Sequence, residues 1–224
     1  MPPSVPVDLT TPGGLLLVLA VLLPFVGLML GFVLGGRRAQ QVAWVTIGLG
    51  AVLVAAIAHR LWVSADALVY LLGGWAPPLG VMLRADGLSV CMMVLVMVVV
   101  IGIGIYANAD FRTPDGVREK RGALTFWLLL LAVWGSLNLV FVSGDVFTLY
   151  VALELLTFAG VPLVCLDGRG ETLQAALRYL LYALAGSMLY LLGVFLLYGA
   201  YGTLDIALLA QRVGAEPVAW VPRH

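Results

Sequence analysis

The stretch 144-GDVFTLYVALELLTFAGVPLV-164 decides how this chain folds. Glu154 is the one charged residue between Asp145 and Asp167. The run is otherwise apolar, and about 20 apolar residues are enough for a helix to cross a bilayer. The stretch therefore predicts a membrane-spanning helix with a carboxylate inside it.

The composition of the whole chain supports the same class. Of its 224 residues, 62% are hydrophobic and 11% are charged, whereas soluble domains carry about a quarter charged residues. The formal net charge is zero and the basic residues are scattered, which gives no support for nucleic-acid binding. Cys91 and Cys165 match no metal-ligand spacing. We expect an integral membrane protein with no metal and no cofactor.

The apolar segments predict an all-α fold with about six transmembrane helices in a single membrane domain, residues 1–224. The N-terminus has no Lys or Arg before its first apolar run, which favours an uncleaved first helix over a signal peptide. Gly27, Gly31 and Gly35 follow one another at four-residue spacing. This face either admits another helix closely or reflects how common glycine is in membrane helices. The expected spans are 14–36, 41–63, 86–108, 123–143, 145–166 and 173–201.

Two segments between and after these helices are of another kind. The loop 64–84 is apolar but contains Gly73-Gly74 and Pro77-Pro78, which break helices. Its short flanks predict a small hairpin at the outer surface between helices two and three. The tail 203–224 is too short to cross again, and its first half predicts an amphipathic helix at the interface.

The basic residues indicate the orientation. Eight of the twelve fall in connections or helix ends on one side of the membrane. By the positive-inside rule that side is cytoplasmic, so we expect both termini on the outer side of the cell inner (plasma) membrane. The eight are Arg37, Arg38, Arg112, Arg118, Lys120, Arg121, Arg169 and Arg178.

Glu154 is the main candidate for function. If its helix begins near Asp145, the carboxyl lies roughly 13 Å deeper, close to the midplane of a core about 30 Å thick. An ionised carboxylate there costs several kcal/mol. It is either held protonated, or it faces a cation or a water-filled path. Both arrangements suit a proton relay, and a structural hydrogen bond between helices is the alternative.

Other polar residues inside the spans have weaker signals. Tyr150 and Thr157 share the helical face of Glu154 and either hold a water chain or pack ordinarily. Arg178 either snorkels to the cytoplasmic surface or tunes a proton path. Asp86 favours a helix cap. Single hydroxyls and amides in spans usually bond backbone groups, so we expect structural roles for Ser136, Asn138, Tyr182, Ser187 and Tyr190.

Three stretches together resemble one family. They are 143-SGDVFTLYVALELLTFAG-160, 177-LRYLLYALAGSMLYLLGVFLLYGAYGTLDIALL-209 and 73-GGWAPPLGVMLRADGLS-89. They are similar to the antiporter-like subunits of Mrp-type cation/proton antiporters and to the related proton-pumping subunits of respiratory complex I and membrane-bound hydrogenases. The resemblance covers about residues 65–210 and concerns the N-terminal portion of the family.

The resemblance implies roles for two residues and raises one difficulty. It makes Glu154 a proton-path residue and places Arg178 where the family usually has a lysine, although an arginine is effectively never deprotonated. Family members usually have many more helices, including a broken seventh helix whose lysine pairs with the glutamate. The only lysine here is Lys120. The resemblance thus implies a split or shortened subunit and a partner chain that supplies the missing helices and lysine.

Three functions follow from these observations. The first is a proton-translocating subunit of a hetero-oligomeric complex in the lipid bilayer, moving protons and, in one version, sodium. The driving force is a cation gradient, a redox reaction on other subunits, or another coupled process such as inorganic-carbon uptake. The second is a structural or assembly subunit without conduction. The third, an autonomous membrane enzyme, is disfavoured because no nucleophile–base pair or metal cluster appears in the spans.

Overall fold

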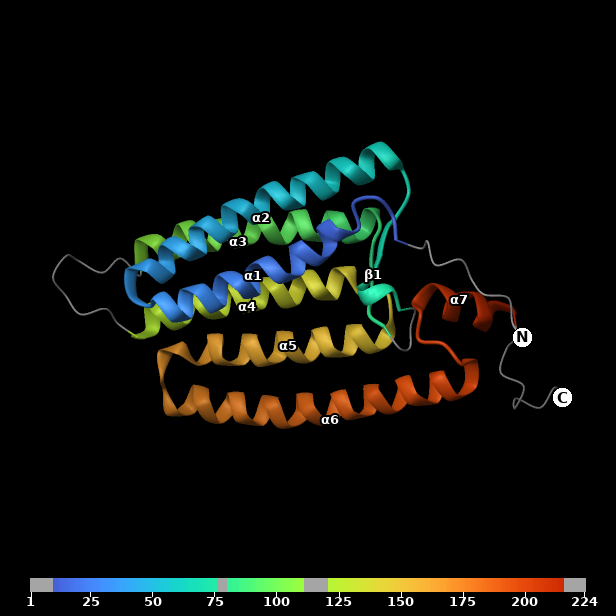
Figure 1. Ribbon diagram of the computed structural model, residues 1–224. Coiled ribbons are helices and arrows are strands. Elements are labelled where there is room, and N and C mark those ends of the chain that lie inside the picture. The colour runs from blue at the N-terminus through green and yellow to red at the C-terminus, as the bar shows by residue number, and fades with distance from the viewer. Residues whose placement is uncertain (1–9, 76–79, 111–120, 216–224) are drawn as a thin grey trace.

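The computed structural model describes residues 10–75, 80–110 and 121–215, and these form a bundle of long helices (Figure 1). In this described part, six helices are long and apolar enough to cross a membrane, as the sequence predicts. They are α1 (Leu15–Leu34), α2 (Gly36–Ser64), α3 (Gly87–Asp110), α4 (Arg121–Val142), α5 (Val146–Val164) and α6 (Gly170–Tyr201).

Two helices begin earlier than the apolar pattern indicates. α2 begins at Gly36 instead of residue 41, and α6 at Gly170 instead of residue 173. In both cases the first turn is polar, so a search for apolar runs misses it. Gly35 and Gly36 have φ values of 59° and 56°, which favour glycine and let α1 turn directly into α2.

The helices are not buried equally. α1 to α4 pack together, α5 lies beside α4, and α6 lies outermost beside α5 (Figure 1). Half of the residues in the most apolar stretch of α4 are buried in the structure, but only 6% of those in the most apolar stretch of α6. One buried cluster surrounds Leu17, Ile57 and Met93, and the other surrounds Trp127 and Trp134. The rigid core therefore lies in α1 to α4, and α5 and α6 form a layer on its side.

The glycine face of α1 does admit close neighbours. A Cβ atom at Gly27 would overlap the side chain of Thr46 in α2. A Cβ at Gly31 would lie 3.1 Å from Leu128 in α4. Gly35 has another role, because it ends the helix with a positive φ. Close packing thus explains two of the three glycines.

A short antiparallel pair of strands connects α2 to α3. β1 (Leu68–Leu71) pairs with β2 (Met82–Ala85) so that Leu68 is opposite Ala85. The side chains at both ends of this pair are buried, which seats the strands against the ends of the helices. Pro77-Pro78 lie outside the described residues, and the position of this element on the outer surface stays a prediction.

The last described helix, α7 (Ile206–Ala215), occupies the first half of the predicted tail. It lies at the end of the bundle where α6 finishes (Figure 1). Arg212 of α7 donates a hydrogen bond to the carbonyl of Tyr201, the last residue of α6. Residues 216–224 of the predicted interfacial tail lie outside the described part.

Asp86 caps α3, as its sequence context predicts. Its carboxylate accepts hydrogen bonds from the backbone N–H of Ser89 at 2.9 Å and from the Ser89 hydroxyl at 3.1 Å. The backbone hydrogen bond is the main cause that lowers the pKa of Asp86 below its ordinary value.

A proline inside α1 is compensated by α4. Pro24 has no N–H, so the carbonyl of Ala20, four residues earlier, has no normal helical partner. The fully buried Asn138 of α4 donates to this carbonyl from Nδ2 at 2.8 Å. In a membrane a neighbouring helix is the usual source of such a repair. Asn138 is therefore structural, as expected, and it joins α4 to the weak point of α1.

We predict that the effects of Asn138→Leu and Pro24→Ala are coupled. Asn138→Leu leaves the Ala20 carbonyl without a donor and lowers stability by about 1 kcal/mol. Pro24→Ala restores a backbone N–H at residue 24, so Asn138→Leu costs less in that background. Thermal unfolding of the four proteins in detergent measures the cycle. Equal losses in both backgrounds would show that the hydrogen bond contributes nothing.

Candidate functional site

Glu154 lies on the side of α5 that faces α6. Its side chain is half-buried and lines a cavity of about 350 Å³ between the two helices. In the part of the chain that the structure describes, no hydrogen bond or ion pair holds the carboxyl. Apart from Glu154 and Thr157 the lining is apolar; it consists of Phe158, Leu177, Leu180, Leu181 and Leu184.

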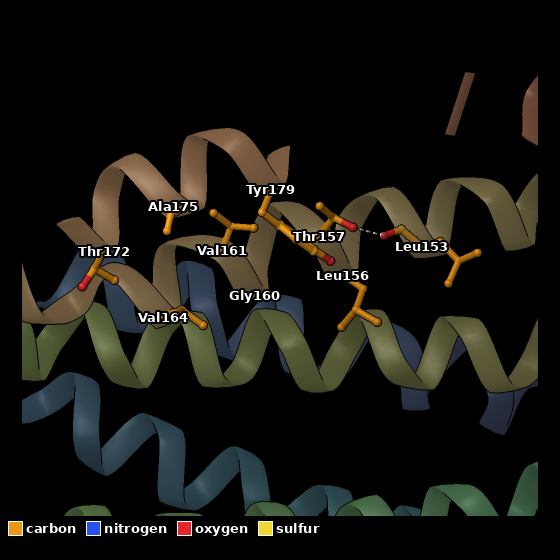
Figure 2. A pocket seen from close by; sticks show the side chains of 10 residues that line it. Leu153, Leu156, Thr157, Gly160, Val161, Val164, Thr172, Ala175 and Tyr179 are labelled. Atoms are coloured by element: carbon orange, nitrogen blue, oxygen red, sulfur yellow. Dashed lines mark hydrogen bonds between the residues drawn. The ribbon is translucent and has the colours of Figure 1, made fainter. Parts of the chain in front are cut away.

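Thr157 lies between this cavity and a larger one. The second cavity, of about 650 Å³, follows the seam between α5 and α6 toward their connection (Figure 2). The Thr157 hydroxyl donates to the carbonyl of Leu153 at 3.0 Å, the dashed line in Figure 2. This is the back-bonding expected of a hydroxyl in a span, but the oxygen can still accept a hydrogen bond. Thr157 is thus the polar group shared by both cavities.

Tyr150 lies one turn from Glu154, in the direction of the α5 N-terminus. Its ring stacks on that of Tyr190 from α6, with centroids 6.0 Å apart and planes at 14°. The Tyr190 hydroxyl donates to the carbonyl of Val146 at 3.1 Å. The sequence predicts a structural role for Tyr190, and this bond between helices agrees with it.

Arg178 does not line the cavity beside Glu154, but the residue before it, Leu177, does. The Arg178 side chain itself is exposed. The structure places Glu154 and Thr157 at one cavity, and Tyr150 lies one turn from Glu154 on α5. The functional roles of these three residues and of Arg178 stay predictions.

From the sequence, Asp145 is only the expected start of a helix. In the structure its side chain caps α5 and links this helix to β2. Its buried carboxylate accepts from the N–H of Thr148 at 2.7 Å and from the Thr148 hydroxyl at 2.6 Å, and it lies 3.5 Å from the N–H of Met82 in β2. An aspartate followed three residues later by a hydroxyl is the signal that indicates this cap.

The backbone around Asp145 joins three parts of the fold. Gly144 donates to the carbonyl of Met82 at 2.9 Å and accepts from Ile206 at 3.1 Å, and Val146 donates to the carbonyl of Leu204 at 3.0 Å. A Cβ on Gly144 would lie 2.9 Å from the backbone oxygen of Met82, so glycine is required at this position. The Gly144-Asp145 pair therefore ties α5 to β2 and to the start of α7.

Comparison with known proteins shows that the chain is similar to membrane subunits of known complexes. Residues 143–220 match the transmembrane family described as NADH:quinone oxidoreductase/Mrp antiporter. The chain is 34% identical, over 64% of its length, to a subunit of the Na(+)/H(+) antiporter of Alkalihalophilus pseudofirmus, and covers 28% of that protein. It is 37% identical, over 80% of its length, to NADH-quinone oxidoreductase subunit N of Desulforudis audaxviator, and covers 33% of it.

Solved structures show the same fold. A chain of the archaeal membrane-bound sulfane sulfur reductase matches with a TM-score of 0.73 and 22% identity, over 87% of this chain and 39% of that one. A chain of the Mrp complex from Dietzia sp. matches with a TM-score of 0.69 and 22% identity, over 92% and 39%.

The present chain spans about a quarter to two fifths of the length of the curated relatives that it matches. It is homologous to the antiporter-like membrane subunits of the Mrp and complex I families, and this partial coverage is consistent with their N-terminal portion.

We predict that Asp145 acts through its hydrogen bonds and not through its charge. Asp145→Ala removes the acceptor for Thr148 and costs about 1 kcal/mol of stability, as other N-cap losses do. Asp145→Asn keeps an acceptor oxygen and costs less. Thermal unfolding compares the two variants, with Asp66→Ala in an exposed turn as the control. An Asp145→Asn variant as unstable as Asp145→Ala would show that the charge is required.

Proposed function

We propose that this chain is a proton-translocating, antiporter-like subunit of a multisubunit membrane ion-transport complex, and that Glu154 is its proton-binding group. One observation supports the proposal most directly. Glu154 is a half-buried carboxyl in an apolar span, beside a cavity, with no hydrogen bond or ion pair in the described part of the chain. A structural acid would have partners, because an unpartnered one lowers stability.

The cavities on the two sides of Thr157 offer space along the seam between α5 and α6. A proton-binding carboxyl needs water or hydroxyl groups that deliver and remove the proton. Tyr150 lies on one side of Glu154 and Thr157 on the other, one turn away in each direction. We propose that water in these cavities joins the three groups into the proton path.

A cation from another helix would complete this site. In the described residues α4, α5 and α6 bring no lysine near Glu154, and Lys120 lies outside those residues. A positive group that approaches and withdraws changes the proton affinity of a carboxyl. We propose that helices beyond these 224 residues, on a partner membrane subunit, supply that lysine and cover α6.

The arrangement of the connections agrees with the orientation expected from charge. The α1–α2 and α5–α6 connections, the end of α3 and the start of α4 lie at one end of the bundle, and β1 and α7 lie at the other (Figure 1). Arg37 and Arg38 follow the first of these connections and Arg169 lies in the third. We propose that this end faces the cytoplasm and that both termini lie outside the plasma membrane.

The proposed role is transport and not catalysis. Within the described residues no group of three His, Cys, Asp or Glu side chains forms a metal site. Some relatives belong by name to quinone oxidoreductases. If this chain joins such a complex, we propose that the redox chemistry takes place on other subunits and that its own part is to move protons, or protons against sodium.

We predict that Glu154→Gln reduces transport by about 100-fold or to background, because an amide cannot bind and release a proton. Glu154→Asp keeps part of the activity, since the carboxyl survives about one methylene away. Proton flux in vesicles measures transport, and co-purification of the complex measures assembly. Glu171→Gln, which neutralises an exposed acid at the start of α6, is the matched control.

Normal transport by an assembled Glu154→Gln complex would contradict the proposed role. It would favour the second function, a structural or assembly subunit without conduction. In that case the Glu154 carboxyl contributes nothing to proton flux. Only substitutions in the buried core of the bundle would then change the activity of the complex.

We also predict that the 224-residue chain, purified alone and placed in liposomes, does not conduct protons. Without a cation from another helix the proposed site around Glu154 is incomplete, so no proton path crosses the membrane. A pH-sensitive dye inside the liposomes measures the flux, and liposomes with Glu154→Gln are the control. Uptake that exceeds the control would show that no further helix is needed.

A further inference from the structure

Two buried side-chain atoms of α4 lack a hydrogen-bond partner in the part of the chain that the structure describes. They are Nε1 of Trp134 and Oδ1 of Asn138. Trp134 is 1% exposed and Asn138 is 0% exposed. A buried polar atom that loses its water and gains no partner costs the full free energy of its desolvation. Native proteins therefore rarely leave such atoms unpaired, and each one needs an explanation.

The two side chains are held by different neighbouring helices. Trp134 packs its six-membered ring on Gly50 of α2, where a Cβ atom would overlap the ring. Asn138 donates from Nδ2 to the carbonyl of Ala20 in α1 at 2.8 Å, and this bond leaves its Oδ1 atom unused. The contacts fix both side chains at the place where α4 meets α1 and α2.

The two unpaired atoms are complementary. The indole N–H of Trp134 is a donor only, and the amide oxygen of Asn138 is an acceptor only. The residues are four positions apart, so their side chains are neighbours on one face of α4, with Cβ atoms about 5–6 Å apart. In the structure the two atoms do not bond each other. A water molecule with a hydrogen bond of about 2.9 Å on each side spans a gap of that size.

The same place is where the hydrogen bonding of α1 is interrupted. Pro24 is fully buried and leaves the carbonyl of Ala20 without its helical donor. This carbonyl accepts from Asn138 and still has a second lone pair. Ordered water is one of the means by which membrane helices satisfy backbone groups that a proline has freed. A water between Trp134 and Asn138 thus has a third partner nearby, and about three hydrogen bonds are typical of buried water.

We propose that the core formed by α1, α2 and α4 contains a binding site for a single water molecule. The water accepts a hydrogen bond from the indole N–H of Trp134. It donates one hydrogen bond to Oδ1 of Asn138 and the other to the carbonyl of Ala20. It thereby connects the amide that repairs the break at Pro24 to the tryptophan that packs on α2, and one polar cluster holds three helices together inside an apolar core.

Water-edited solid-state NMR of the full chain in lipid bilayers tests the site. The experiment transfers magnetisation from water protons to the isotope-labelled indole nitrogens of the six tryptophans. The Trp134→Phe variant identifies the Trp134 signal, because that signal is the one it loses. Trp134 is buried, so its indole N–H receives magnetisation rapidly only when a water molecule lies beside it. We expect rapid transfer to Trp134 in the wild-type chain.

Three variants examine the partners of the water. Asn138→Leu removes the acceptor, so transfer to Trp134 should become several-fold slower. Ser136→Ala is the matched control, because Ser136 is also buried on α4 but its hydroxyl bonds to the carbonyl of Ala132 in its own helix; transfer to Trp134 should not change. Trp134→Phe is read at the side-chain amide of Asn138, one of two asparagines in the chain, which should receive magnetisation several-fold more slowly.

Equal transfer to Trp134 in the wild type and in Asn138→Leu would overturn the inference, whether it is slow or fast in both. Slow transfer in the wild type would mean that Trp134 and Asn138 bond each other directly or stay unpaired. An unchanged Asn138 signal in Trp134→Phe would show that the tryptophan does not bind the water. Trp134→Phe keeps an aromatic ring on Gly50, so this measurement keeps the test valid if Asn138→Leu fails to fold.

The outcome is separate from that of the proposed function. The water site lies among α1, α2 and α4, whereas Glu154 lines a cavity between α5 and α6. Normal transport by Glu154→Gln would contradict the role of Glu154 and leave the water site as it is. Slow transfer of magnetisation to Trp134 would remove the water site and leave the role of Glu154 as it is.

Discussion

The rest of the structure depends on the rule that, inside a bilayer, the protein must satisfy its own backbone hydrogen bonds. The rule is visible where α1 breaks it. Pro24 leaves the Ala20 carbonyl without its helical donor, and the amide of Asn138 supplies one from the neighbouring helix. The hydroxyls of Thr46, Ser136 and Ser143 likewise donate to carbonyls four residues earlier. These internal hydrogen bonds make α1 to α4 a rigid core, and the outer layer of α5 and α6 packs against it.

The same rule organises the end of the bundle that carries β1 and α7. Gly144 and Val146 give their N–H groups to β2 and to the segment before α7, and Asp145 closes the first turn of α5. These contacts set where α5 begins, and hence the depth of Glu154 nine residues later. Gly144 and Asp145 are thus structural, and they act on the candidate site only by setting its position.

Much of this architecture could be predicted from the sequence because it rests on length and apolarity. The six spans and the Asp86 cap follow from composition and spacing, whereas the spacing of Gly27 and Gly31 left their close packing as one of two alternatives. The polar first turns of α2 and α6 could not be predicted in this way, because a hydropathy pattern has no signal for them. The hydrogen bond from Asn138 to the carbonyl of Ala20 could not be predicted either, because the two residues are 118 positions apart in the sequence. The face shared by Glu154, Tyr150 and Thr157 follows from helical spacing, but the stacking of Tyr150 on Tyr190 needs the packing of α5 against α6.

The contrast between Asn138 and Glu154 is the physical reason to separate structure from function in this chain. Both are polar groups in apolar helices, but Asn138 is fully buried and its donor is used, whereas Glu154 is half-buried beside open space with no partner in the described residues. A fold selected for stability alone would place an apolar residue at position 154 and close the cavity. The carboxyl instead lies in the layer with the least burial, where a neighbouring helix can reach it and where its surroundings can change without disturbing the core. That is the place where a group that changes its protonation state costs the fold least.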